Sequence, residues 1–191
     1  VEQGLSRVYP LIESYAHVVG YVGPVSDNDL KDGNESNPLL KIPRFQVGKV
    51  GIERQFEGVL RGSAGVMKVE VNALGRVMRN LDRKEGKPGK NIQLTVDTEL
   101  QAYIQARLGS ESASAVVMNC KNGEILAIAS SPSYDPNKFV KGISYSDFNE
   151  LRDNEFRPLA SKTVQDAYPP GSTFKIVTAL AALKANIISP K

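Results

Sequence analysis

Cysteine and histidine are almost absent from this 191-residue chain, which contains one of each, Cys120 and His17. A single cysteine cannot form an internal disulfide, and a lone histidine in an apolar stretch has no partner ligands, so we expect structural roles for both. The sequence also lacks a metal-ligand cluster, a phosphate-binding loop and a nucleotide-binding fingerprint. We therefore expect no metal and no cofactor.

Strong charge imbalance and long hydrophobic runs are missing too. The net charge of +3 is too small to indicate binding to nucleic acid. No segment is long and apolar enough to cross a bilayer, and no signal-peptide pattern is present. The content of 41% hydrophobic and 24% charged residues is typical of globular proteins, and the length accommodates one to two domains.

The most informative stretch of the chain is Tyr168-Pro-Pro-Gly-Ser-Thr-Phe-Lys175, which precedes an apolar run ending at Lys184. The prolines and the glycine interrupt the chain, so a helix is expected to open at Ser172. Residues three apart share a helix face, which places the Lys175 amine within reach of the Ser172 hydroxyl. The pattern predicts a serine nucleophile beside an amine base, on a helix whose apolar surface belongs in a domain interior.

The spacing alone is weak evidence, because about one Ser-x-x-Lys pair is expected by chance in a chain of this size. Taken by itself, the motif is equally compatible with an ordinary serine cap on a core helix, followed by a lysine that reaches to solvent.

Pro-Pro-Gly-Ser-Thr-Phe-Lys resembles the active-site segment of the penicillin-binding proteins, the serine D,D-transpeptidases that cross-link peptidoglycan. Other segments resemble the same family in the expected order. Residues 51–62 resemble a pedestal signature of the class B members, and residues 7–23 resemble the segment upstream of it. Residues 92–101 resemble the entry into the transpeptidase domain, and residues 115–137 resemble the strand pair and the loop that precede the serine. The resemblance to members of the cell-elongation machinery is greater than that to the division-specific class B enzymes.

This resemblance implies a catalytic pair, Ser172 as the acyl-ester nucleophile and Lys175 as the general base. It implies a peptidoglycan stem peptide as substrate, β-lactam antibiotics as acylating ligands, and a membrane glycosyltransferase and a scaffold of the elongation complex as partners. The implied location is the periplasmic side of the bacterial inner membrane, with attachment only through an N-terminal anchor that this sequence does not contain.

The sequence departs from the family pattern in two places. Ser161-Lys162 stands where the family has an Asn-Arg pair, although Lys162 keeps the positive charge. The family's Ser-x-Asn and Lys-Thr-Gly motifs do not follow the active-site helix. We therefore expect a piece of a longer protein, nearly inert alone because those motifs supply the surroundings of Lys175 and one oxyanion donor.

Two other functions are compatible with parts of the pattern. A serine β-lactamase or penicillin sensor would share the Ser-x-x-Lys chemistry, although such proteins are usually single domains without a pedestal. A non-enzymatic pedestal that docks partners of the elongation complex could coexist with the enzyme.

The expected fold class is α+β, with a strand-rich pedestal over residues 1–90 and the first part of a transpeptidase domain over 91–191. The boundary is placed in the charged stretch 82–90, whose glycines and proline are typical of an exposed connection. In the second domain we expect an antiparallel sheet covered by helices. The near-continuous apolar character of its hairpin strands predicts cover on both faces.

Individual elements follow from periodicity and turn signals. Residues 26–37 can be aligned with a calcium-binding loop only by placing leucines at ligand positions, so a surface loop is predicted there. Helices are predicted over 51–61, 98–108 and 145–152. Strands are predicted over 67–71 and 92–96, and an Asn-Gly hairpin over 113–119 and 124–130.

Overall fold

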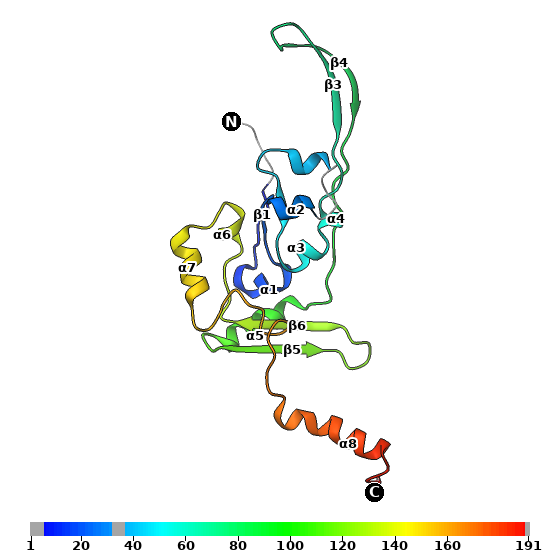
Figure 1. Ribbon diagram of the computed structural model, residues 1–191, viewed down its shortest axis with the longest axis vertical. Helices are drawn as coiled ribbons and strands as arrows, with labels where there is room; N and C mark the ends of the chain where they lie inside the picture. The colour runs from blue at the N-terminus through cyan, green and yellow to red at the C-terminus, as the bar shows by residue number, and fades with distance from the viewer. Residues whose placement is uncertain (1–5, 32–36, 190–191) are drawn as a thin grey trace.

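The computed structural model describes residues 6–31 and 37–189 as an elongated molecule of short helices and two-stranded antiparallel sheets (Figure 1). In chain order the elements are η1 (Ile12–Ser14), α1 (Ala16–Val19), β1 (Val22–Pro24), α2 (Asp27–Lys31), η2 (Pro38–Lys41), β2 (Gln46–Gly48), α3 (Gly51–Gln55), α4 (Glu57–Leu60), β3 (Val66–Val71), β4 (Val77–Lys84), α5 (Thr98–Leu108), β5 (Ala113–Met118), β6 (Ile125–Ser131), α6 (Asn137–Val140), α7 (Tyr145–Asp153), η3 (Gly171–Phe174) and α8 (Lys175–Lys184). The expected α+β class is confirmed.

The body of the N-terminal part is formed by the β1–β2 pair with α1 and α3. Gly20 ends α1 with a φ of +79°, and a Cβ there would lie 2.0 Å from the carbonyl oxygen of Val50. Only glycine combines this left-handed conformation with so close a backbone approach. The segment that begins α3 can therefore lie directly against the end of α1.

An ion pair with a buried carboxylate fixes α3 against the N-terminal segment. Glu53 is 5% exposed and accepts two bonds from Arg7, at 2.8 Å to Oε1 and 3.1 Å to Oε2. The Tyr9 hydroxyl donates to Glu53 Oε1 at 3.2 Å and accepts from the Val22 amide at 2.9 Å. Burial first, and then the carboxylate of Glu53, raise the pKa of Tyr9. This network joins three segments around one carboxylate, which is consistent with a structural role for the pedestal signature.

The polar stretch 26–37 differs from the predicted loop in its first half, where α2 forms. The Ser26 amide and hydroxyl both donate to Asp29 Oδ2, at 2.7 and 2.6 Å. These two bonds at the start of the helix stabilise its first turn. The second half includes residues 32–36, which lie outside the described part of the chain.

Helix and strand predictions around the pedestal signature are close to the structure. The predicted helix over 51–61 is divided into α3 and α4 at Phe56, and its Glu57–Arg61 pair forms at 2.5 Å. The predicted strand over 67–71 pairs with β4 as a long ribbon at one end of the molecule (Figure 1). Since β4 continues to Lys84, the first residues of the predicted connection 82–90 are in fact a strand.

The β5–β6 hairpin and α5 form as predicted from the Asn-Gly turn and from Asp97, whose Oδ1 accepts from the Leu100 amide at 2.8 Å. The predicted cover on both sheet faces is wrong for the described residues. Since α5 packs on one face, exposure alternates along β5, and Val116 and Met118 are 49% and 57% exposed on the other.

The predicted strand over residues 92–96 does not form. Thr95 Oγ1 donates to Ile125 O at 2.7 Å, and Asp97 N, just after the segment, donates to Leu126 O at 2.8 Å, so the contact is with the first two residues of β6. One backbone hydrogen bond does not make a ladder, which requires paired bonds along the length of both strands.

The two buried apolar clusters join segments from both sides of the predicted boundary. One cluster contains Tyr9, Val22 and Val140, and the other contains Ala16, Tyr134 and Phe139. The Asn137 side chain accepts from Tyr9 N at 2.9 Å and donates to Tyr9 O at 3.0 Å. The segment after β6 therefore completes the core of the N-terminal part.

The chain then passes through α7 and a long loop to η3 and α8, which stand apart from the body in Figure 1. No helix among the described residues is both long and apolar enough to cross a membrane.

Candidate active site

Ser172 lies in a single turn of 3₁₀ helix that leads directly into α8. Gly171, with φ of +53°, turns the chain after the two prolines, and the Thr173 amide donates to Pro170 O at 3.2 Å. The Lys175 amide donates to the carbonyl of Ser172 and begins α8. The predicted helix start is thus confirmed, with the serine in its first turn.

This geometry places Ser172 and Lys175 on the same face, because residues three apart are nearly eclipsed in a 3₁₀ turn. Both residues are exposed. In the part of the chain that the structure describes, no hydrogen bond joins the Ser172 hydroxyl to the Lys175 amine. The serine hydroxyl also makes no capping bond to α8, which removes the direct support for a purely capping role.

The predicted burial of the active-site helix is not observed. Ile176, Val177 and Leu180 are 69%, 53% and 61% exposed, and Phe174 in the preceding turn is 54% exposed. No other described element covers these side chains extensively. The helix has the apolar composition of a buried helix, but no described element surrounds it, as expected for a piece of a larger domain.

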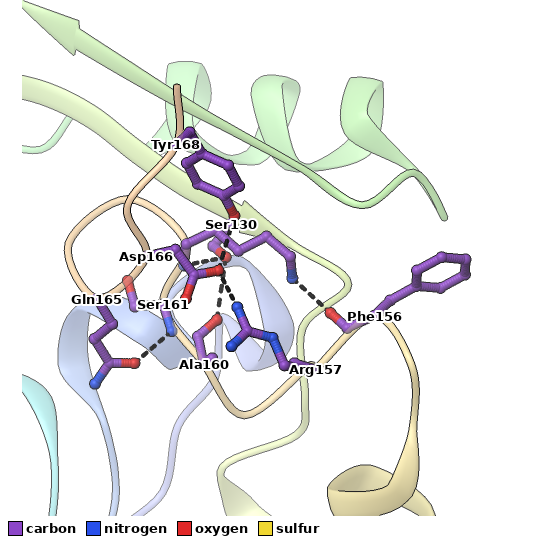
Figure 2. A network of polar contacts seen from close by, with 9 residues as sticks. Ser130, Phe156, Arg157, Ala160, Ser161, Gln165, Asp166 and Tyr168 are labelled. Atoms are coloured by element: carbon purple, nitrogen blue, oxygen red, sulfur yellow. Dashed lines mark hydrogen bonds and ion pairs between the residues drawn. The ribbon is translucent and has the colours of Figure 1, made fainter. Parts of the chain in front are cut away.

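Polar contacts hold the loop before the serine (Figure 2). Asp166 Oδ2 accepts a hydrogen bond from the Tyr168 hydroxyl at 2.8 Å and forms an ion pair with the Arg157 guanidinium. The hydrogen bonds from Tyr168 and then Arg157 lower the pKa of the Asp166 carboxyl. We call Arg157, Asp166 and Tyr168 the loop clamp. It was not predicted from the sequence, since its members are ordinary polar residues of a loop.

A buried lysine lies at the base of the same loop. Lys162 is 5% exposed, and its Nζ donates to the carbonyl of Phe156 at 2.7 Å. Its amide donates to Ser130 Oγ at 3.1 Å, which ties the loop to β6. Burial lowers the pKa of the Lys162 ammonium. The residue that departs from the family's Asn-Arg pair therefore has a defined structural position.

His17 is structural, as predicted. Its Nε2 lies 2.8 Å from the carbonyl oxygen of Pro158, and its ring meets the edge of Tyr134 with centroids 5.3 Å apart. Burial lowers the pKa of His17, and the Lys162 charge acts in the same direction. Cys120 is exposed in the turn of the hairpin. Residues 6–31 and 37–189 contain no group of side chains suited to a metal.

Residues 1–94 match the family described as the penicillin-binding protein dimerisation domain, and residues 113–191 match the penicillin-binding protein transpeptidase domain. The chain belongs to the penicillin-binding proteins that combine these two domains, which confirms the resemblance noted in its sequence.

Among individual relatives, the chain is 42% identical to the peptidoglycan D,D-transpeptidase MrdA of Salmonella typhimurium, over 97% of this chain and 30% of that protein. The structure is similar to that of PBP2 from Pseudomonas aeruginosa, determined in complex with WCK 5153, with a TM-score of 0.81 and 38% identity over 97% of this chain and 37% of the other. It is also similar to PBP2 of Helicobacter pylori in a complex with MreC, with a TM-score of 0.84 and 34% identity over 94% of this chain and 33% of the other. The chain thus spans about a third of the length of these relatives.

Proposed function

We propose that this chain supplies the nucleophilic part of a peptidoglycan D,D-transpeptidase, with Ser172 as nucleophile and Lys175 as general base. The observation that carries the proposal is the Pro-Pro-Gly turn into η3, which brings a hydroxyl and an amine onto one face at the start of an apolar helix. Residues 91–191 would then be the first part of the catalytic domain, and residues 1–90 the pedestal.

The chemistry requires two acyl transfers. Ser172 Oγ attacks the carbonyl carbon between the last two D-alanines of a stem peptide, while Lys175 accepts the hydroxyl proton and passes it to the departing amine. The carbon–nitrogen bond breaks, the terminal D-alanine leaves, and an acyl-ester remains on Ser172. The amine of a second stem peptide then attacks the ester, its proton passes through Lys175 to Ser172 Oγ, and the serine is released. A β-lactam would acylate the same oxygen by opening its ring, and its departing nitrogen would stay attached to the acyl group.

The experiment is acylation by fluorescent penicillin in the full-length protein that contains this sequence. We expect Ser172→Ala to abolish covalent labelling, and Lys175→Ala to slow it by at least about 100-fold, because general-base catalysis contributes 10²–10⁴-fold. Ser146→Ala on α7 and Lys184→Ala at the far end of α8 are matched controls, both exposed. Persistent labelling of the Ser172→Ala protein would remove Ser172 from this role.

A β-lactamase or sensor function has less support, because residues 1–94 match the dimerisation domain, and this match supports a pedestal before the proposed catalytic segment. The same labelling experiment separates a β-lactamase from a transpeptidase. A β-lactamase would release the label by hydrolysis within seconds, whereas a transpeptidase would retain it.

Docking of a scaffold protein is the second function that we propose, since the H. pylori PBP2 structure similar to this one was determined with MreC. In the β3–β4 ribbon, the register places Val71 opposite Val77 and Glu70 opposite Arg79, on opposite faces. Met67 and Val77 are 55% and 60% exposed. We expect Val77→Asp to weaken capture of the scaffold by the full-length protein, and Arg79→Ala to change it less. Equal capture by all forms would contradict docking on this ribbon.

We place the whole protein on the periplasmic face of the inner membrane, where its substrate is cross-linked. The proposed membrane glycosyltransferase partner would supply the glycan strands there. Co-purification of the full-length protein with a glycosyltransferase from solubilised membranes tests the proposed partner. Absence of the full-length protein from inner-membrane fractions would contradict the proposed location.

A further inference from the structure

The position of Ser172 depends on one short connection. Within the described residues, η3 and α8 pack mainly against each other, and Figure 1 shows α8 at the end of an extended segment leaving the body of the molecule. The residues between the loop and Ser172 are therefore the part of this chain that sets where the hydroxyl lies relative to β6.

This connection is short and largely constrained. Three residues separate Tyr168 from Ser172, and two of them are prolines, whose rings fix φ near −65°. Pro170 has φ of −70° and ψ of −17°, and the third residue, Gly171, turns the chain into η3 with φ of +53°. A change in the direction of the backbone at Tyr168 is consequently transmitted toward the serine, and Gly171 is the one residue of the connection that can absorb part of it.

The loop clamp lies at the start of that connection. Asp166 Oδ2 is shared by the Tyr168 hydroxyl and the Arg157 guanidinium, and the Asp166 side chain is 11% exposed although that of Arg157 is 58% exposed. Charge-assisted hydrogen bonds to one carboxylate oxygen are stronger and shorter than neutral ones. Asp166 therefore holds together residues that are eleven positions apart in the loop.

The base of the loop is fixed to the hairpin in turn. Ser130 on β6 is 1% exposed, and its hydroxyl accepts from the Lys162 amide. The Ser161 amide donates to Gln165 Oε1 at 2.8 Å, which closes the turn just before Asp166 (Figure 2). These hydrogen bonds, together with the peptide bonds between Ser161 and Lys162 and between Gln165 and Asp166, link β6 to Tyr168.

We propose that the loop clamp positions Ser172 for acylation. The inference rests on the function proposed above, and it makes Tyr168, Asp166 and Arg157 positioning residues with no direct contact to substrate. A nucleophile displaced by about 1 Å from its productive position can lose about 100-fold in rate. Binding of the substrate, which depends on other surfaces, is not expected to change.

The test uses the full-length protein and compares Tyr168→Phe with Tyr145→Phe. Both tyrosines are exposed, at 59% and 91%, but only Tyr168 belongs to the clamp. The acylation rate is measured against penicillin concentration, which separates the limiting rate from the affinity of the non-covalent complex. We expect Tyr168→Phe to lower the limiting rate about three- to tenfold, the effect of one ordinary hydrogen bond at an exposed position. The affinity and the melting midpoint should not change, and Tyr145→Phe should behave as the unmodified protein.

Two further variants distinguish positioning from simple structural support. Asp166→Asn should lower the limiting rate, and combining it with Tyr168→Phe should add little, because both changes weaken the same bond. Asp166→Glu should restore part of the rate. An unchanged limiting rate in Tyr168→Phe, or a loss explained entirely by a lower melting midpoint, would overturn the proposal.

The result also separates this inference from the proposed function. Continued labelling of the Ser172→Ala protein would contradict the function itself. Loss of labelling in Ser172→Ala together with an unmodified rate in Tyr168→Phe would contradict the clamp alone.

Discussion

His17 joins two parts of the molecule through a single side chain. Its ring lies between the loop before Ser172, at Pro158, and the aromatic core at Tyr134. With Nε2 at hydrogen-bond distance from a carbonyl, a neutral ring with its proton on Nε2 satisfies the contact. Burial lowers the pKa of this histidine below its ordinary value of 6.5, so the folded protein resists protonation here.

We predict that acidification destabilises the protein through His17. The unfolded chain takes up a proton below pH 6.5 and the folded protein does not, so the stability contributed by this site is complete above pH 6.5 and is lost as pH falls toward the lowered pKa. The loss is at most about 1.4 kcal/mol per pH unit. Melting midpoints from pH 7.5 to 5.5 should fall, and His17→Gln, which keeps a donor for Pro158, should flatten the dependence. Because His17 is the only histidine, equal slopes for both proteins would contradict this assignment.

The residues of the candidate site differ in how far the sequence predicts them. Ser172 and Lys175 could be proposed from the Pro-Pro-Gly turn, their spacing and the resemblance of the segment to the family, because all three signals lie within a few residues. The loop clamp cannot, because the contact between Arg157 and Asp166 depends on how the loop folds back on itself. Lys162 could be flagged as a departure from the family pattern, but its burial follows only from its contact with β6.

At the scale of elements, one side chain joins a helix, a strand and the N-terminal segment. Gln101 on α5 is 1% exposed. Its Nε2 donates to Ser14 O at 2.8 Å and to Ile128 O at 2.9 Å, and its Oε1 accepts from the Ile128 amide at 2.8 Å. The amide group thus pairs with the free edge of β6 as a neighbouring strand would.

We predict that Gln101→Ala lowers the free energy of unfolding by about 2–4 kcal/mol, because it removes three hydrogen bonds to half-buried backbone groups. Gln93→Ala, at an exposed position just before the helix, is the matched control and should change it by less than about 0.5 kcal/mol. Urea unfolding followed by far-ultraviolet circular dichroism measures both. A Gln101→Ala protein as stable as the control would show that water replaces the lost partners.

Local signals explain which elements were predicted correctly. The Asn-Gly turn and the Asp97 cap define β5, β6 and α5, because each signal lies within a few residues of the element that it specifies. Residues 92–96 have the apolar alternation of a strand, but a strand also requires a partner along its length. Among residues 6–31 and 37–189 no strand pairs with it along its length, so the periodicity alone predicted the wrong structure.

At the scale of the whole molecule, the N-terminal part and the later segment share their cores. Tyr21 stacks on Phe139 with ring centroids 4.1 Å apart, and Gln46 donates to Val140 O at 2.5 Å. Composition and linkers place a boundary near residue 90, but they contain no information about which apolar faces meet. The described residues around α1, β1 and α6 therefore form one packed unit, whereas α8 and the β3–β4 ribbon extend from it.

This arrangement leads to a prediction for the 191-residue chain by itself. Its packed unit should unfold cooperatively, but α8 should remain exposed and bind a hydrophobic dye. Acyl transfer needs oxyanion donors and a neutral base as well as a nucleophile, and in the described part of the chain Ser172 and Lys175 lie in solvent without a cover. Since the loss of one oxyanion donor costs about 10²–10³ in rate, we expect penicillin to label the chain at least about 100-fold more slowly than the full-length protein.

Ser172→Ala in the isolated chain is the control for non-specific labelling, and measuring the rate at several protein concentrations tests whether a second copy assists. Labelling at the full-length rate would mean that η3 and α8 alone assemble the site, and the surroundings of Lys175 would then have to come from this chain. Slow labelling that still disappears in Ser172→Ala would instead assign the chemistry to Ser172. Its acceleration would then come from surroundings that η3 and α8 lack in the described part of this chain, because oxyanion donors in a water-excluded site supply much of the rate of acyl transfer.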